Sequence, residues 1–269
     1  MTPAGKRASA GDGRIKALGQ RLLPWLLPLL GLAAWEGLTR AGLMSSRLLP
    51  RASDVAVATV RLTVSGELPT HLRASFLRAA AGFAVGGSIG FVLGLFNAMS
   101  TIAEQLLDST VQMIRNIPHL AMIPLVILWF GIDEEAKLFL VALGVMFPIY
   151  VNTFHGIRTV DNGLVEMARS YGLSSWQLFW QVILPGALPS ILVGLRFALG
   201  LMWLTLIVAE TISAPSGIGY MAMNAREFLQ IDVVMLAVLL YALLGKAADS
   251  AARLLERLTL QWHPAYGKG

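Results

Sequence analysis

The chain has 269 residues, of which 56% are hydrophobic and 14% charged, and its mean hydropathy is +0.66. A soluble domain carries about 25% charged residues, so the composition excludes an ordinary soluble protein and predicts an all-α, polytopic integral membrane protein. The chain contains no cysteine, which excludes disulfide, iron–sulfur and thiolate-zinc chemistry. The basic residues behind the net charge of +5 flank apolar runs, so the predicted partner is the lipid bilayer and not a nucleic acid.

The N-terminal part of the chain predicts a tail and a first membrane span. Residues 1–21 are basic, and the apolar run Leu22–Leu38 follows them. That run is long for the apolar region of a signal peptide, and no small-x-small cleavage site closes it, so residues 1–21 are expected to be a cytoplasmic tail. Residues 22–71 are expected to form the first transmembrane helix and an external loop. In this loop a short surface helix is predicted from Ser53 to about Val64, although alternating valines leave a strand open.

The second predicted span, Ser75–Met99, carries a regular glycine pattern. Gly82, Gly86, Gly90 and Gly94 recur every four residues. Overlapping small-xxx-small steps place these glycines on one face of a helix, where a neighbouring helix can approach closely. The pattern therefore predicts tight helix packing and no further function.

The predicted transmembrane core of the chain, residues 72–250, contains the second span and four more. Each has about 20 residues, the length that crosses about 30 Å of hydrocarbon. Two prolines, Pro118 and Pro124, are expected to interrupt the hydrogen bonds of the third span. A short acidic connection, Ile102–Asp108, is expected before that span, and a loop over Pro215–Gln230 is expected after the fifth. Residues 251–269 are expected to be a cytoplasmic tail. Spans three to six are predicted at Val111–Gly131, Ala136–Phe154, Ser190–Ala214 and Ile231–Ala248.

The polar stretch over residues 158–189 separates the fourth and fifth spans. It is expected to lie outside the bilayer as two short helices. Asp161 or Asn162 can cap the first helix, and Gly172 is placed to end it in a left-handed turn. The remaining signals are a capping box for the second helix, Ser174 with Gln177, and the expected end of that helix at Leu184 and Pro185.

The spacing of this stretch resembles the EAA loop of bacterial ABC-importer permeases, written E-A-A, three residues, G, nine residues and I-x-L-P. The chain departs from that pattern at Met167 and Val182. The resemblance implies the type I ABC importer permease fold, with six transmembrane helices, and a cytoplasmic coupling loop that docks into an ATPase subunit. An ordinary amphipathic loop between two helices is the alternative. The residues that the resemblance assigns to ATPase coupling are Glu166, Ala168, Gly172, Leu184 and Pro185.

The likeness extends from about Leu48 to the C-terminus. Stretches such as RNIPHLAMIPLVILWFGIDEEAK resemble the permeases that import nitrate, taurine, sulfonates and bicarbonate, and the aliphatic-sulfonate branch in particular. The resemblance implies a homodimer in the bacterial inner membrane, two cytoplasmic ABC ATPases and a periplasmic sulfonate-binding protein, which together supply sulfur to the cell. A slight excess of basic residues on the predicted inner side favours cytoplasmic N- and C-termini.

The chain has no Gly-x-x-x-x-Gly-Lys-Ser/Thr loop, the motif that cradles nucleotide phosphates. We therefore expect it to be a transport subunit and not an enzyme, with no catalytic residues and no cofactor, while a partner ATPase binds the ATP. Its four histidines lack the spacing of metal ligands, so no metal site is predicted.

Ionisable residues inside the predicted spans are candidates for the translocation pathway. A charge at mid-membrane costs roughly 2.5 to 3.5 kcal/mol, so each needs a partner, a cavity or an interface. Glu210 is expected near the outer end of the fifth span, either bonded to backbone or to an arginine of the next helix, or as a wall of the pathway. Arg196 either reaches the headgroups or faces the pathway. His119 either faces the pathway or is a packing residue, which is the more frequent role of a lone histidine. The candidate pathway residues are Arg115, Asn116, His119, Arg196, Thr205 and Glu210.

Three alternatives to a sulfonate permease remain at this point. A taurine or nitrate permease of the same family differs only in substrate. An ion-coupled secondary transporter, driven through Glu210 or His119, would transport without an ATPase and would leave the capped loop over residues 158–189 without a purpose. A polytopic membrane enzyme would need a cluster of polar residues at one membrane face, and the sequence shows none.

Overall fold

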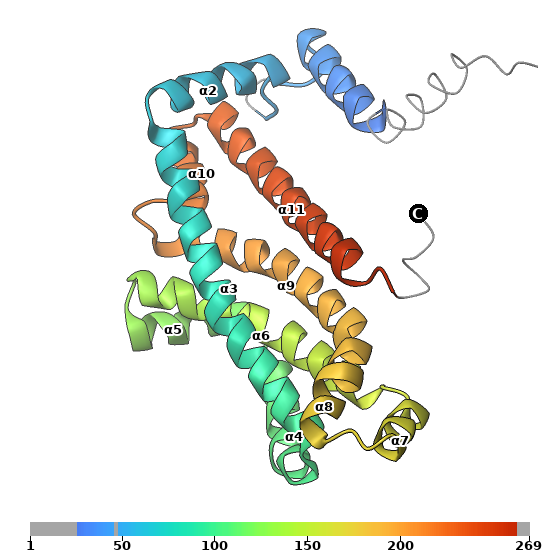
Figure 1. The fold of residues 1–269 in the computed structure, drawn as a ribbon. Coiled ribbons are helices and arrows are strands. Elements are labelled where there is room, and N and C mark those ends of the chain that lie inside the picture. The colour runs from blue at the N-terminus through green and yellow to red at the C-terminus, as the bar shows by residue number, and fades with distance from the viewer. Residues whose placement is uncertain (1–25, 46–47, 263–269) are drawn as a thin grey trace, which may run out of the picture.

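The fold is built from helices throughout the part of the chain that the computed structural model describes, residues 26–45 and 48–262 (Figure 1). Those residues contain no strand, so the predicted all-α class is confirmed. After a helix over residues 26–40, the elements are α2 (Ala52–Val64), α3 (Glu67–Met99), α4 (Thr101–Arg115), the 3-10 turn η1 (His119–Met122), α5 (Ile123–Phe130), α6 (Glu134–Arg158), α7 (Asn162–Ser170), α8 (Ser175–Leu178), the π turn η2 (Phe179–Ile183), α9 (Leu184–Ser213), α10 (Ile218–Glu227) and α11 (Ile231–Thr259).

The described residues account for four or five of the six predicted spans. Four helical runs are long and apolar enough to cross a membrane, and the bent pair formed by Thr101–Arg115 and His119–Phe130 makes a fifth if it is one broken span. The first predicted span begins outside the described residues, and its remainder lies in the helix over residues 26–40. The expected tail over residues 1–21 also lies outside the described residues. The four unbroken runs are Glu67–Met99, Glu134–Arg158, Ser175–Ile212 and Ile231–Thr259.

Helices α3 and α6 pack along the predicted glycine face. A Cβ added at Gly86 or Gly90 would overlap the backbone of Ala142 or Met146 on α6, and one added at Gly94 would lie 2.7 Å from the carbonyl oxygen of Tyr150. Only glycine leaves room for backbones this close. The prediction of tight packing from the four-residue glycine period is therefore confirmed.

The predicted third span is not one straight helix. α4 begins at Thr101, where the Ser100 hydroxyl caps it by accepting a hydrogen bond from the N–H of Ala103, so the expected acidic connection Ile102–Asp108 is helical. The chain then bends by 78° between the two halves. Pro118 lies at the break because proline donates no hydrogen bond and restricts the residue before it. Pro124 lies in the first turn of α5 and does not interrupt it, since proline suits the first turn of a helix.

Two further segments differ from expectation, the first of them at the end of the bundle where α2 lies, called here the α2 end (Figure 1). The expected loop Pro215–Gln230 contains the helix α10, and α11 continues past Ala248 to Thr259. The segment predicted as a surface helix or strand is the helix α2. Buried side chains of α2, α10 and α11 form one apolar cluster that includes Val55, Leu62, Ile218, Met221 and Val233.

Candidate functional site

Residues 158–189 are called here the 158–189 segment. Its helices α7 and α8 lie at the end of the bundle opposite α2 (Figure 1). Asp161 caps α7 by accepting a hydrogen bond from the N–H of Gly163 at 2.8 Å. Gly172 has φ of +82°, the left-handed conformation that was predicted for the end of the first helix. Ser174 and Gln177 form the predicted capping box, with hydrogen bonds of 2.9 and 3.3 Å. The sequence therefore predicted the turn chemistry of this segment correctly.

The expected end of the second helix at Leu184 and Pro185 is wrong. α8 continues through the π turn η2 into α9, and the run from Ser175 to Ile212 is one candidate span. Pro185 is tolerated because it lies in the first turn of α9, where a missing N–H costs little, and because the π turn before it shifts the hydrogen-bond register. The 158–189 segment is consequently joined to α9 without a loop.

The outer surface of α7 and α8 is apolar and aromatic. Ala168 is buried and Glu166 is exposed on α7. Exposed patches of this kind, rimmed by charge, are typical of protein interaction sites. The exposed large side chains of the segment are Leu164, Met167, Tyr171, Trp176 and Trp180.

A cavity of about 270 Å³ lies beside the break between α4 and α5, with Arg115 and His119 among its lining residues. His119 Nε2 lies 3.0 Å from the hydroxyl oxygen of Thr205 on α9. Asn116 caps the C-terminus of α4 and is exposed, but does not line this cavity. The structure thus brings three of the six candidate pathway residues together here.

Arg196 belongs to a different environment. Its guanidinium Nε donates to Asp249 on α11 at 2.6 Å, and Arg253 shares the same carboxylate. Arg196 does not line the cavity. The ion pair joins α9 to α11, an outcome that neither of the two sequence interpretations of Arg196 included.

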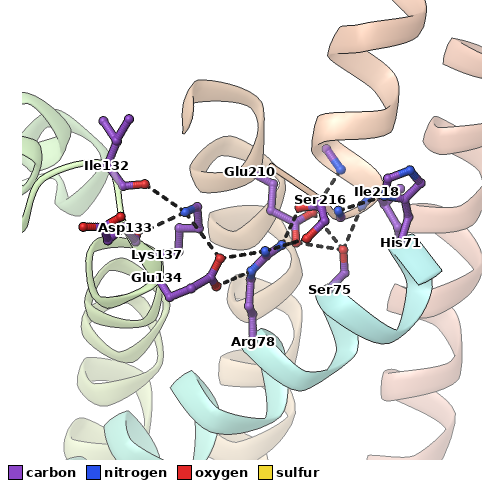
Figure 2. A network of polar contacts seen from close by, with 12 residues as sticks. His71, Ser75, Arg78, Ile132, Asp133, Glu134, Lys137, Glu210, Ser216 and Ile218 are labelled. Atoms are coloured by element: carbon purple, nitrogen blue, oxygen red, sulfur yellow. Dashed lines mark hydrogen bonds and ion pairs between the residues drawn. The ribbon is translucent and has the colours of Figure 1, made fainter. Parts of the chain in front are cut away.

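Glu210, near the end of α9, is the centre of the polar network in Figure 2. Its side chain is fully buried. The carboxylate accepts hydrogen bonds from Ser75 Oγ and Arg78 Nη1 at 2.8 Å, from the N–H of Gly219 at 2.9 Å and from Tyr241 Oη at 3.1 Å. These partners come from α3, α10 and α11, so one carboxylate joins four helices. The geometry matches the interpretation of Glu210 as a bonded carboxylate, with the arginine on α3 and not on the next helix.

Arg78 extends this network to α6. Its guanidinium donates to both carboxylate oxygens of Glu134, at 2.6 and 2.8 Å, and to the carbonyl oxygen of Ser216 at 2.5 Å (Figure 2). Arg78 was not among the residues singled out from the sequence, so its role was missed. One signal was present, because Arg78 is the single charged residue of the run Ser75–Met99 and an isolated charge in a span requires a partner.

The start of α10 is capped by side chains of neighbouring helices. The first N–H groups of a helix have no partner within it. Those of Gly217, Ile218 and Gly219 donate in order to His71 Nδ1, Ser75 Oγ and Glu210, at 3.1, 2.8 and 2.9 Å. The network therefore fixes α10 against α3 and α9 at the α2 end.

Residues 86–261 match the family described as binding-protein-dependent transport system inner membrane component. The chain belongs to this family. The permease is 65% identical over 91% of its length to the putative aliphatic sulfonates transport permease protein SsuC of Escherichia coli K12, and covers 94% of that protein. It is 44% identical to the SsuC protein of Bacillus subtilis 168, over 93% of this chain and 92% of that one. It is 34% identical to the taurine transport system permease protein TauC of Escherichia coli K12, over 86% of both chains.

The permease also resembles a solved structure in fold. A chain of the inward-facing MetNI methionine ABC transporter is 22% identical and superposes with a TM-score of 0.51, over 73% of this chain and 97% of that one. This likeness shows a shared fold. The family match identifies the permease as a multi-pass inner-membrane component of a binding-protein-dependent transport system. ATP hydrolysis and substrate capture belong to separate ATPase and substrate-binding subunits.

Proposed function

We propose that the permease carries aliphatic sulfonates across the bacterial inner membrane in an ATP-driven importer. The observation that carries this proposal is the 65% identity to the sulfonate permease of Escherichia coli over nearly the whole chain, against 34% for the taurine permease of the same organism. Such a difference favours an alkanesulfonate without an amino group over taurine, which is an aminoalkanesulfonate, or nitrate. An ion-coupled secondary transporter is disfavoured by membership of a family of binding-protein-dependent systems.

The proposed assembly is a homodimer with two cytoplasmic ATPases and a periplasmic sulfonate-binding protein, and with both termini of each permease in the cytoplasm. The apolar surface of α7 and α8 supports an ATPase contact, because exposed aromatic side chains such as Trp176 and Tyr171 stabilise protein interfaces when they are buried. The α2 end, on the opposite side of the bundle (Figure 1), would then face the periplasm.

Within this assembly the EAA-like residues have separate roles. Glu166 is exposed on α7 and would contact the ATPase. Ala168 is buried and would hold α7 against the rest of the 158–189 segment. Gly172 makes the turn between the two short helices. Leu184 and Pro185 begin α9 directly after the π turn, so they would transmit movement of the ATPase to α9.

Gly172 provides a test of ATPase coupling. No atom lies within 4 Å of a Cβ added there, but its φ of +82° disfavours β-branched side chains. We expect Gly172→Val to distort the turn and to remove most of the ATPase that co-purifies with an affinity-tagged permease. Gly172→Asn is the matched control, because asparagine tolerates the left-handed conformation. Normal co-purification of the valine variant would refute the proposed role of this turn.

The substrate is tested by uptake of labelled alkanesulfonate in a bacterial strain that lacks its own sulfonate permease. We expect the permease, expressed with its ATPase and binding protein, to restore uptake and growth on an alkanesulfonate as sulfur source. Restoration of taurine or nitrate uptake alone would contradict the sulfonate assignment. Uptake that persists with an ATPase unable to hydrolyse ATP would instead indicate a secondary transporter.

A further inference from the structure

The cavity of about 270 Å³ beside the α4–α5 break is lined by both polar and apolar residues. Pockets for drug-sized ligands have volumes of about 300–1,000 Å³, so this cavity suits one small organic molecule. Arg115 and Asn152 supply polar lining, and Phe147, Phe197 and Leu201 supply much of the apolar lining. Such a distribution matches a molecule with a polar head and a short hydrocarbon tail.

Arg115 carries a positive charge that the described part of the chain does not neutralise. Arg78, Arg158 and Arg196 each form an ion pair with a carboxylate on another helix. No carboxylate within residues 26–45 and 48–262 lies at ion-pair distance from Arg115, and its side chain is exposed. Arg115 lies in the predicted third span, where a cation requires a counter-charge or water, and guanidinium binds planar or tetrahedral oxyanions through paired N–H groups.

A second feature fixes the wall next to Arg115. The contact between His119 and Thr205 ties the turn η1 to α9. A Cβ added at Gly144 would lie 2.8 Å from the hydroxyl oxygen of Thr205 and 3.4 Å from His119 Nε2. Gly144 therefore leaves the space in which this pair forms, and the pair holds the α4–α5 break, at whose edge Arg115 lies, against the bundle.

We propose that this cavity is an anion-transit site, in which Arg115 binds the sulfonate group of the substrate while Phe147, Phe197 and Leu201 contact its alkyl chain. The permease itself then contributes to substrate selection, in addition to the binding protein. His119 and Thr205 act as positioning residues that hold the wall. The identity of the anion rests on the proposed function, whereas the site itself rests on the cavity and on the unpaired charge of Arg115.

The test uses the complete transporter in liposomes, with binding protein and alkanesulfonates of two chain lengths. A charge-assisted hydrogen bond contributes about 1.5–3 kcal/mol, so Arg115→Gln is expected to lower uptake by roughly tenfold to hundredfold. ATP hydrolysis stimulated by the loaded binding protein should persist, because the coupling surface on α7 and α8 is unchanged. Arg115→Lys should restore part of the uptake. Arg257→Gln, an exposed arginine on α11, is the matched control and should transport normally.

Phe197→Ala gives a readout that a structural defect would not produce. We expect it to change the ratio of uptake rates for long and short alkanesulfonates, because it enlarges the apolar side of the cavity. The proposal is overturned if Arg115→Gln transports like the native chain, if its uptake and its ATP hydrolysis fall in parallel, or if Phe197→Ala alters both substrates equally. A wrong substrate assignment would appear already in the unmodified transporter, and Arg115 would then be tested with the anion that it does transport.

Discussion

Glu210→Gln is expected to destabilise the permease by about 3–5 kcal/mol, the cost of removing one partner from a buried ion pair. Each carboxylate oxygen of Glu210 accepts at least two hydrogen bonds, from donors on α3, α10 and α11. An amide nitrogen in place of either oxygen would point a donor at these donors and would leave Arg78 with a single carboxylate, Glu134. Thermal unfolding of the detergent-solubilised protein, and its yield in the membrane, measure the effect.

Glu135→Gln is the matched control for this substitution. Glu135 is exposed at the start of α6, close in sequence to the network but outside it, so its neutral variant should unfold like the native protein. A Glu210→Gln variant with native melting and reduced uptake would contradict the structural role and return Glu210 to the translocation pathway. Because native proteins are stable by only about 5–15 kcal/mol, the expected loss is large enough to lower the amount of folded permease.

Gly86→Ala is expected to destabilise the permease by about 3 kcal/mol, at the upper end of the cost of overpacking. The added methyl group would overlap backbone atoms of Ala142 on α6. Backbone cannot rotate away as a side chain can, so α3 and α6 would have to separate along their shared face. The measurement is the melting temperature in detergent, compared with that of the native protein.

Gly245→Ala tests whether the effect of Gly86→Ala comes from packing. Gly245 lies within α11, and no atom lies within 4 Å of a Cβ added there. Alanine is the better helix former by up to about 1 kcal/mol, so this variant should be neutral or slightly more stable. Equal behaviour of the two variants would show that the α3–α6 face is not the close contact described above.

The continuity of α8, η2 and α9 bears on how movement reaches the membrane. The sequence indicated a stop at Leu184 and Pro185, since proline usually ends a helix. The structure instead joins the proposed ATPase contact to a span that also contains Thr205 and Glu210. A rotation of α8 would therefore reach the wall of the cavity and the network at the α2 end through one helix.

The sequence by itself determined the features that depend on neighbours in the chain. Local hydrogen bonding and backbone preference determine the helix cap at Asp161, the left-handed turn at Gly172 and the capping box of Ser174 with Gln177. Helix geometry places the glycines of α3, four residues apart, on one face. Only the tertiary structure decided which charges meet. Arg78 and Glu210 are 132 residues apart, and the lack of an ion pair at Arg115 among the described residues depends on every helix around it. The physical reason is that a buried charge is stabilised by whatever the fold brings within hydrogen-bond distance, which no local pattern records.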